Sequence, residues 1–171
     1  MKKIISILMV SIMVLALFTF AGCNKQEPTL KLGLGVYVTA SATDATEDKA
    51  GQGQGTITAA AVLVDAEGKI VKAFIDVADN KVGYTADGKA VANDAFTTKY
   101  EAGKDYNMVA YGGAAKEWFE QADALNTFCI GKTATELKSL VANGYGIADV
   151  QTAGCTISIE ELIKAAVKAA D

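Results

Sequence analysis

Apolar and polar side chains alternate over residues 34–41, the pattern of a strand with one buried face. The polar and charged segment 44–55 follows, and its run Gly51-Gln52-Gly53-Gln54-Gly55 suggests either a flexible turn or a close approach of the backbone to another part of the protein. The apolar members of the alternating pattern are Leu34, Val36, Val38 and Ala40.

Residues 56–64 and 70–77 give the strongest hairpin signal in the sequence. Both runs are rich in β-branched side chains, and the segment 65–69 between them contains Gly68, which suits a turn with positive φ. A weaker turn of the same kind occurs at Asp87-Gly88-Lys89. In the second arm of the hairpin, the residues expected to share one face are Val71, Ala73, Ile75 and Val77.

The hydrophobic period changes in the second half of the chain. Residues 92–108 are polar with scattered aromatic side chains and predict a long loop or a short helix. Apolar residues then recur at helical spacing over residues 114–128, which predicts an amphipathic helix. Trp118 lies on the apolar stripe of this helix, so a core position is favoured over a ligand contact.

Two further helices are predicted from their capping patterns. Thr133 and Glu136 form one such pattern, and Gly144 is the expected end of that helix. Ser158 and Glu161 form the second, before a C-terminal apolar stripe. Strands followed by helices predict an α+β fold, with an antiparallel sheet packed against about three helices in a single domain over residues 31–171.

The N-terminus has the layout of a bacterial secretory signal. Lys2 and Lys3 precede an apolar run over residues 4–20, and the sequence Ala21-Gly22-Cys23 follows. This end resembles a lipobox, with Phe20 where leucine is usual. The resemblance implies a signal peptide over residues 1–22, a lipidated Cys23 and a tether over residues 23–30. It also implies that the protein is anchored at the extracytoplasmic face of the cell membrane of a Gram-positive cell. An uncleaved anchor and an ordinary signal are the alternatives.

Composition excludes several classes of chemistry. The chain has no histidine and no arginine, so it lacks a Ser-His-Asp or Cys-His nucleophile, a histidine metal ligand and an arginine clamp for phosphate. No metal site is expected. The formal net charge is −4, which makes nucleic acid an unfavourable partner. Cys129 and Cys155 either pair as a disulfide in this exported protein or behave as small buried hydrophobes.

Small side chains precede the last helix and give the best candidate for a binding site. They allow a ligand to approach the backbone, and the N–H groups that open a helix favour an anion such as phosphate. The candidate residues are Ala153, Gly154, Cys155 and Thr156.

These residues, with the hairpin Gly55-Thr-Ile-Thr to Ile70-Val71, resemble the FMN-binding domain of exported flavoproteins. That family includes subunits of membrane redox pumps and lipoproteins of extracellular electron transfer. Members carry a Ser/Thr-Gly-Ala-Thr motif whose threonine is joined to the FMN phosphate by a flavin transferase. Gly154 matches the glycine of the motif, and Thr156 matches the acceptor threonine. Two positions depart from the motif: Cys155 replaces its alanine, and Ala153 replaces its serine or threonine. Because of these departures, non-covalent binding of FMN is an alternative.

The resemblance implies a membrane-anchored lipoprotein that binds FMN and relays electrons from a membrane donor. Such a protein is an electron carrier more than an enzyme with its own substrate. Tyr106 is the aromatic candidate for stacking on the flavin ring, beside Tyr84 and Tyr100. Lys99 and Lys104 are candidates for the phosphate, with simple solvation as the alternative. The competing hypothesis is a cofactor-free surface lipoprotein with a binding, structural or antigenic role.

Overall fold

The computed structural model describes residues 29–91 and 96–171. The predicted signal peptide, Cys23 and most of the predicted tether lie outside the described residues. The described part of the chain is an α+β domain, which confirms the predicted fold class.

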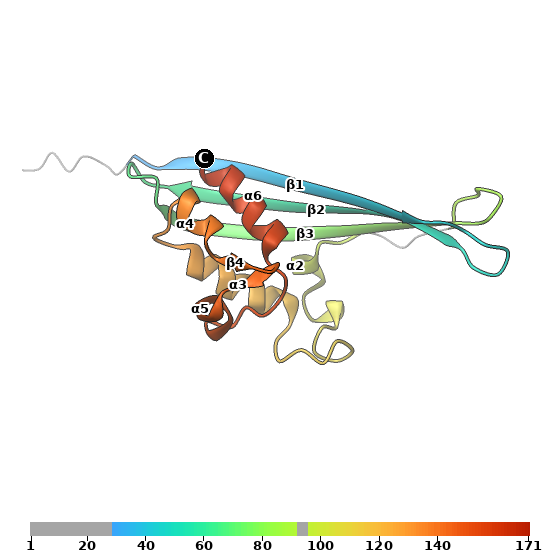
Figure 1. The fold of residues 1–171 in the computed structure, drawn as a ribbon. Coiled ribbons are helices and arrows are strands. Elements are labelled where there is room, and N and C mark those ends of the chain that lie inside the picture. The colour runs from blue at the N-terminus through green and yellow to red at the C-terminus, as the bar shows by residue number, and fades with distance from the viewer. Residues whose placement is uncertain (1–28, 92–95) are drawn as a thin grey trace, which may run out of the picture.

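Three long strands form an antiparallel sheet in the order β1-β2-β3. They are β1 (Lys31–Thr43), β2 (Gly51–Val64) and β3 (Ile70–Tyr84). Figure 1 shows that the helices gather at one half of this sheet, while the other half extends beyond them as a ribbon. The predicted hairpin is confirmed, since Gly68 occupies the left-handed region with φ of 75° in the turn between β2 and β3.

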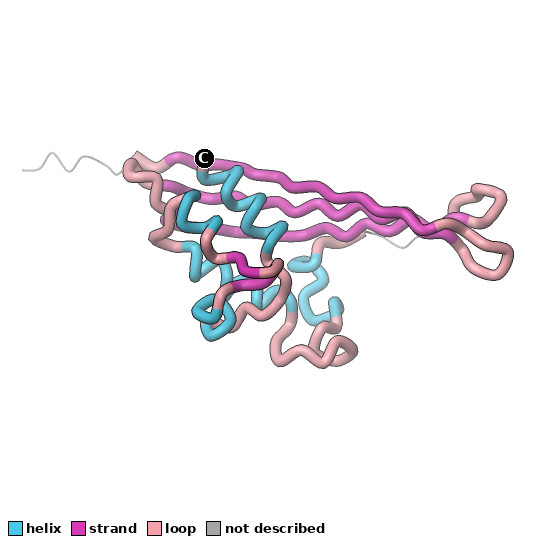
Figure 2. Tube along the Cα trace, in the orientation of Figure 1, coloured by secondary structure: helices cyan, strands magenta, loops and turns pink. Residues whose placement is uncertain are grey.

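The second half of the described chain consists of short helices, the loops between them and one small hairpin (Figure 2). The hairpin consists of β4 (Val141–Ala142) and β5 (Tyr145–Gly146). The helices are α2 (Lys99–Ala102), the 3-10 helix η1 (Gly103–Tyr106), α3 (Trp118–Cys129), α4 (Ala134–Lys138), α5 (Ala148–Thr152) and α6 (Glu160–Ala170).

The core lies between one face of the sheet and two of these helices. Helix α6 packs on β1 and β2, whereas α3 packs on β3. Alternate residues of the central strand face the helices, and Ala60 and Val62 are almost completely buried. Other fully buried side chains at this interface are Ile75, Leu125 and Ile159. The apolar sides of α3 and α6 thus cover one face of the sheet.

The alternation in β1 predicts a strand correctly, but the apolar side chains lie on the opposite face from the core. Leu34, Val36 and Val38 are exposed, and the odd-numbered positions face α6. The physical reason is the pair of glycines at 33 and 35. A Cβ at Gly33 would overlap the carbonyl oxygen of Ala169, so only glycine lets the backbone of α6 approach β1 this closely.

For the glycine-rich run over residues 51–55, the alternative of a flexible turn is wrong, and the alternative of a close backbone approach is confirmed at Gly51. These residues are the first part of β2 and pair with both neighbouring strands. At Gly51 a Cβ would meet the ring of Tyr84, so a close approach within the sheet accounts for that glycine. Val71 was expected on the buried face but is exposed, because the register between β2 and β3 shifts at Leu63 and Val64.

The capping patterns have different outcomes. Thr133 and Glu136 form the predicted capping box at the start of α4. That helix ends at Lys138 rather than near Gly144, which instead turns the β4–β5 hairpin with φ of 84°. The pattern at Ser158 does not form a cap, since its hydroxyl donates to the carbonyl of Gly144 at 3.0 Å and α6 begins two residues later.

Candidate functional site

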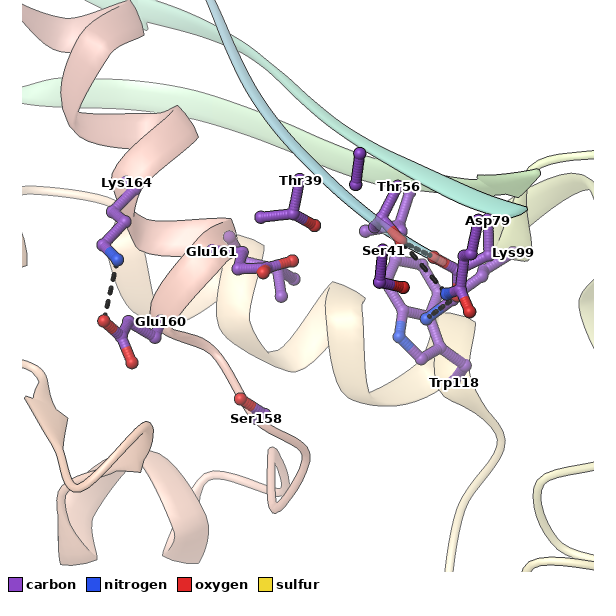
Figure 3. A pocket seen from close by; sticks show the side chains of 14 residues that line it. Thr39, Ser41, Thr56, Asp79, Lys99, Trp118, Ser158, Glu160, Glu161 and Lys164 are labelled. Atoms are coloured by element: carbon purple, nitrogen blue, oxygen red, sulfur yellow. Dashed lines mark hydrogen bonds and ion pairs between the residues drawn. The ribbon is translucent and has the colours of Figure 1, made fainter. Parts of the chain in front are cut away.

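A cleft lies between the sheet, the start of α6 and the start of α3. Its larger cavity, of about 590 Å³, is lined by β1, β2 and β3 on one side and by residues 158–164 on the other. A second cavity, of about 370 Å³, extends from it towards η1 and residue 156. Lys99, Trp118 and Ser158 line both cavities, so the two lie side by side. Figure 3 shows the larger cavity with Lys99 above the indole of Trp118.

A chain of polar contacts fixes Lys99 at the junction of the two cavities. The Lys99 ammonium is 2.8 Å from the carboxylate of Asp79 on β3. Asp79 also accepts a hydrogen bond of 2.7 Å from the hydroxyl of Thr56 on β2. The Gln54 amide donates to that same hydroxyl at 3.3 Å. Polar side chains of the sheet thus hold one another and Lys99 in place along this wall of the larger cavity (Figure 3).

The Asp79–Lys99 pair keeps both partners charged. Burial alone raises the pKa of Asp79, but the hydrogen bonds from Lys99 and Thr56 outweigh it, so the pKa lies below the ordinary value for aspartate. Burial alone lowers the pKa of Lys99. The hydrogen bond and the charge of Asp79 outweigh burial, so the pKa of Lys99 lies above the ordinary value for lysine. The ammonium therefore remains a permanent positive charge at the cavity junction.

Aromatic rings surround this charge. The Lys99 nitrogen lies 5.3 Å from the ring centroid of Tyr106 and 5.8 Å from that of Trp118, both within the range of cation–π attraction. Tyr145 lines the smaller cavity with them. Trp118 is buried, which confirms its core position, although one part of it forms the cavity wall.

Gln121 holds Thr156 in place at the far end of the smaller cavity. Its side-chain oxygen accepts hydrogen bonds from both the backbone N–H and the hydroxyl of Thr156, each at 2.9 Å. Its side-chain nitrogen donates to the carbonyl of Lys116 at 3.0 Å. Because Gln121 is buried, the hydroxyl of the exposed residue Thr156 has a fixed position.

Glu117 fixes the loop after Tyr106 in a similar way, by hydrogen bonds to its backbone. Its carboxylate accepts the N–H groups of Met108 and Val109 at 2.9 and 3.3 Å. Glu117 is buried and lies immediately before α3, so the loop after Tyr106 is attached to the start of that helix. Both ends of the smaller cavity are therefore fixed by polar side chains near the beginning of α3.

The predicted site residues separate into two groups. Tyr106 and Thr156, distant in sequence, both line the smaller cavity. Ala153 instead lines a different surface hollow beside α3. Gly154, with φ of 107°, lies against the ammonium end of Lys116, which would be in contact with any Cβ there.

Cys155 is part of the core and contributes no surface to the cleft. Cys155 and Cys129 are both buried free thiols, so the alternative of a disulfide is not observed. Burial raises the pKa of Cys129 to about 12 and that of Cys155 to about 11. Both thiols remain protonated and unreactive in the folded protein.

The start of α6 differs from the anion cradle expected from the sequence. Thr156 precedes the first residue of α6, Glu160, by four positions. The N–H groups of Ile159 and Glu160 donate to the carbonyl of Gly144 at 2.9 and 3.3 Å. Glu160 and Glu161 add negative charge to the first turn. An anion near Thr156 would depend on lysine side chains rather than on this helix terminus.

Several residues of the cleft have only weak signals in the sequence. Gln121 could have been noticed as a polar residue on the apolar stripe of the predicted helix. Asp79 and Thr56 lie 23 residues apart on the two strands of the β2–β3 hairpin, and the register of that hairpin pairs them directly. Tyr84 and Tyr100 lie elsewhere: the Tyr84 hydroxyl donates to the carbonyl of Thr43, and Tyr100 packs on Phe74 and Phe119.

Comparison of the chain with protein families, with curated proteins and with solved structures found no match. Within residues 29–91 and 96–171, none of the helices has the length and apolar character needed to cross a bilayer.

Proposed function

We propose that the protein binds FMN in the cleft and relays electrons as a lipoprotein anchored at the extracytoplasmic face of the membrane. The observation that carries the proposal is the convergence of Tyr106 and Thr156 on one cavity of about 370 Å³. Both were singled out from the sequence for the same ligand. Together with the adjoining cavity, the space lies in the range of about 300–1,000 Å³ typical of small-molecule sites.

The side chains of the cleft suit an aromatic ligand that carries a phosphate. Tyr106 and Tyr145 offer aromatic faces for the ring system. The Lys116 ammonium lies against Gly154, two residues before Thr156, and would supply positive charge for the phosphate without any arginine.

Bound FMN would supply the redox chemistry, and the protein would supply position and electrostatics. The fixed position of the Thr156 hydroxyl, with its proton donated to Gln121, supports its assignment as the covalent attachment point. A flavin transferase and a membrane electron donor are the partners that this function needs.

FMN titration of the purified full-length chain in mild detergent tests binding. We expect quenching of flavin fluorescence, and we expect Tyr106→Ala to weaken binding by about tenfold, the size of one aromatic contact. Tyr111→Ala is the matched control, because Tyr111 is 88% exposed and does not line either cavity. Absence of quenching in the wild-type chain, or equal weakening by the two substitutions, would contradict the proposal.

Coexpression with a flavin transferase tests the attachment point separately. Flavin fluorescence that stays with the denatured chain and disappears in Thr156→Ala is the expected result. Flavin that is retained after denaturation in Thr156→Ala would assign the bond to another residue. Flavin lost from the wild-type chain on denaturation would indicate non-covalent binding.

The second candidate function is a cofactor-free surface lipoprotein with a binding or structural role. The start of α6 favours it, because the N–H groups of Ile159 and Glu160 are already bonded to Gly144 and two glutamates follow. A wild-type chain that stays colourless and binds no FMN would support this candidate.

A further inference from the structure

The larger cavity of the cleft is a second compartment, and none of the tyrosines assigned to FMN lines it. Two rows of polar side chains on the sheet form its floor. The register aligns Thr39 with Thr56 and Asp79, and it aligns Ser41 with Gln54. The start of α6 forms the facing wall (Figure 3). With about 590 Å³, this cavity alone has the size of a small-molecule site.

The surface of this cavity is hydrophilic. Val77, Trp118 and Leu162 line it, but each is exposed by 5% or less and offers little apolar area to a ligand. The other side chains of its lining carry hydroxyl, amide, carboxylate or ammonium groups, apart from one alanine. Polar groups that lose water on binding need new hydrogen bonds. A matching ligand therefore carries many hydrogen-bonding groups and little apolar surface.

The charges of the cavity are nearly balanced. Lys99 pairs with Asp79 on the sheet side, and Lys164 lies 2.8 Å from Glu160 on the helix side. Glu161 is the remaining charge of the lining, and it belongs to the first turn of α6, which has no side-chain cap. The positive end of the helix dipole offsets part of this charge. The described side chains therefore give the cavity no strong preference for an anion or a cation.

Three polar side chains of the lining have unused hydrogen-bonding capacity. Figure 3 shows Thr39, Ser41 and Glu161 without a bond to the other side chains drawn, and their side chains bond to no other described residue. The two hydroxyl groups can donate and accept, whereas the carboxylate only accepts. A ligand hydroxyl also donates and accepts, so this one kind of group can satisfy all three side chains.

We propose that the larger cavity binds an uncharged carbohydrate. Its hydroxyl groups would donate to Glu161 and would exchange hydrogen bonds with Thr39 and Ser41. The chain of polar contacts from Gln54 to Lys99 already fixes the rest of the floor, which reduces the entropy lost on binding. Because the ligand replaces water at polar groups and buries little apolar area, its dissociation constant is expected in the millimolar range.

Other classes of ligand fit this lining less well. A ligand ammonium beside Glu161 would share the cavity with the ammonium groups of Lys99 and Lys164. A ligand carboxylate or phosphate would share it with three carboxylates. A flat aromatic ligand would leave the hydroxyl and carboxylate groups of the lining without partners. An uncharged sugar avoids each of these costs.

Sugar titrations of the full-length chain, prepared without FMN in a detergent that has no sugar headgroup, test this proposal. The probes are the neutral, amino and uronate forms of glucose and of galactose, which are uncharged, cationic and anionic at about pH 6. Calorimetry should show millimolar binding of a neutral sugar, with its two charged relatives at least about threefold weaker. Trp118 is the only tryptophan and lines the cavity, so its fluorescence should follow the same binding curve.

Two substitutions locate the bound sugar. Thr39→Val removes a hydroxyl that has no partner in the described chain and keeps the β-branched shape, so the protein should fold normally. It should weaken sugar binding by about threefold to tenfold, the size of one hydrogen bond, and Glu161→Gln should act similarly. Thr46→Val and Glu67→Gln are the matched controls. Both residues are exposed and line neither cavity, so binding should be unchanged.

Four results would overturn the proposal. Neither heat nor a fluorescence change with the two neutral sugars would show that the cavity does not take this class of ligand. Tightest binding of the amino sugars would assign a cation site, and tightest binding of the uronates would assign an anion site. Equal affinities of the wild-type chain and Thr39→Val would place the sugar outside this cavity. None of these results depends on FMN, which is absent from every sample.

Discussion

Gln121 is the residue whose role is least visible in the sequence and most visible in the structure. It satisfies the N–H and hydroxyl groups of Thr156 and the carbonyl of Lys116 from a buried position. Gln121→Leu would leave these groups without their partner, so we expect the free energy of unfolding to fall by about 1–3 kcal/mol in urea titrations. Thr156→Val removes only the hydroxyl and should cost less. An equal or larger loss for Thr156→Val would contradict this role.

Ionisation of Asp79 makes the free energy of unfolding depend on pH in the acidic range. Its pKa lies below the usual value in the folded chain, so its contribution is present above about pH 4 and is lost as the pH falls through the folded pKa. At neutral pH we expect Asp79→Asn to lower the free energy of unfolding by about 1–3 kcal/mol, and we expect the difference from wild type to shrink towards pH 2.

Asp87→Asn is the control for this measurement. Asp87 also pairs with a lysine, Lys89, at 2.6 Å, but both side chains are exposed and a surface pair contributes little. We expect no measurable change in stability from this substitution. A difference between wild type and Asp79→Asn that stays constant from pH 2 to pH 7 would contradict the assignment.

At the scale of elements, the contact of α6 with β1 depends on glycine. Gly33→Ala should lower the free energy of unfolding by about 1–3 kcal/mol, because its Cβ would overlap the carbonyl of Ala169. Gly55→Ala on β2 is the control. A Cβ there meets nothing within 4 Å, so stability should be unchanged or raised by up to about 1 kcal/mol. Equal effects of the two changes in thermal unfolding would contradict the close approach of α6.

The same glycines explain why the sequence predicts the strands better than their faces. Alternation identifies β1, but it implies that the apolar side chains are buried. Because Gly33 and Gly35 admit a helix backbone, the core forms on the side of β1 that carries these two glycines, and Leu34 is left outside. Periodicity contains no information about such a contact between distant segments.

The prediction of helix starts from local sequence patterns has a similar limit. Thr133 and Ser158 have the same capping pattern in the sequence, yet only Thr133 forms the box. Ser158 instead pairs with Tyr145 as an isolated β-bridge and donates to Gly144, and a local pattern does not reveal these partners. Of the candidate site, Tyr106 and Thr156 were predicted from sequence, whereas the Asp79–Lys99 pair depends on the packing of α2 against β3.

On the scale of the whole molecule, the two faces of the sheet have different properties. One face is covered by α6 and borders the cleft, with its ordered polar wall and aromatic side chains. The other carries exposed aliphatic side chains, among them those of Leu32, Leu34 and Val38. The burial of the sheet is therefore one-sided, and the candidate ligand site lies on the covered side.

The central claim is that the cleft holds a flavin, and the visible absorption spectrum of the full-length chain tests it most directly. We expect protein purified from membranes of cells that express a flavin transferase to show the oxidised flavin band, which bleaches on reduction with dithionite. We expect Tyr106→Ala to diminish the band, and Tyr111→Ala to leave it unchanged. A colourless wild-type protein that also stays colourless after incubation with FMN would contradict the account.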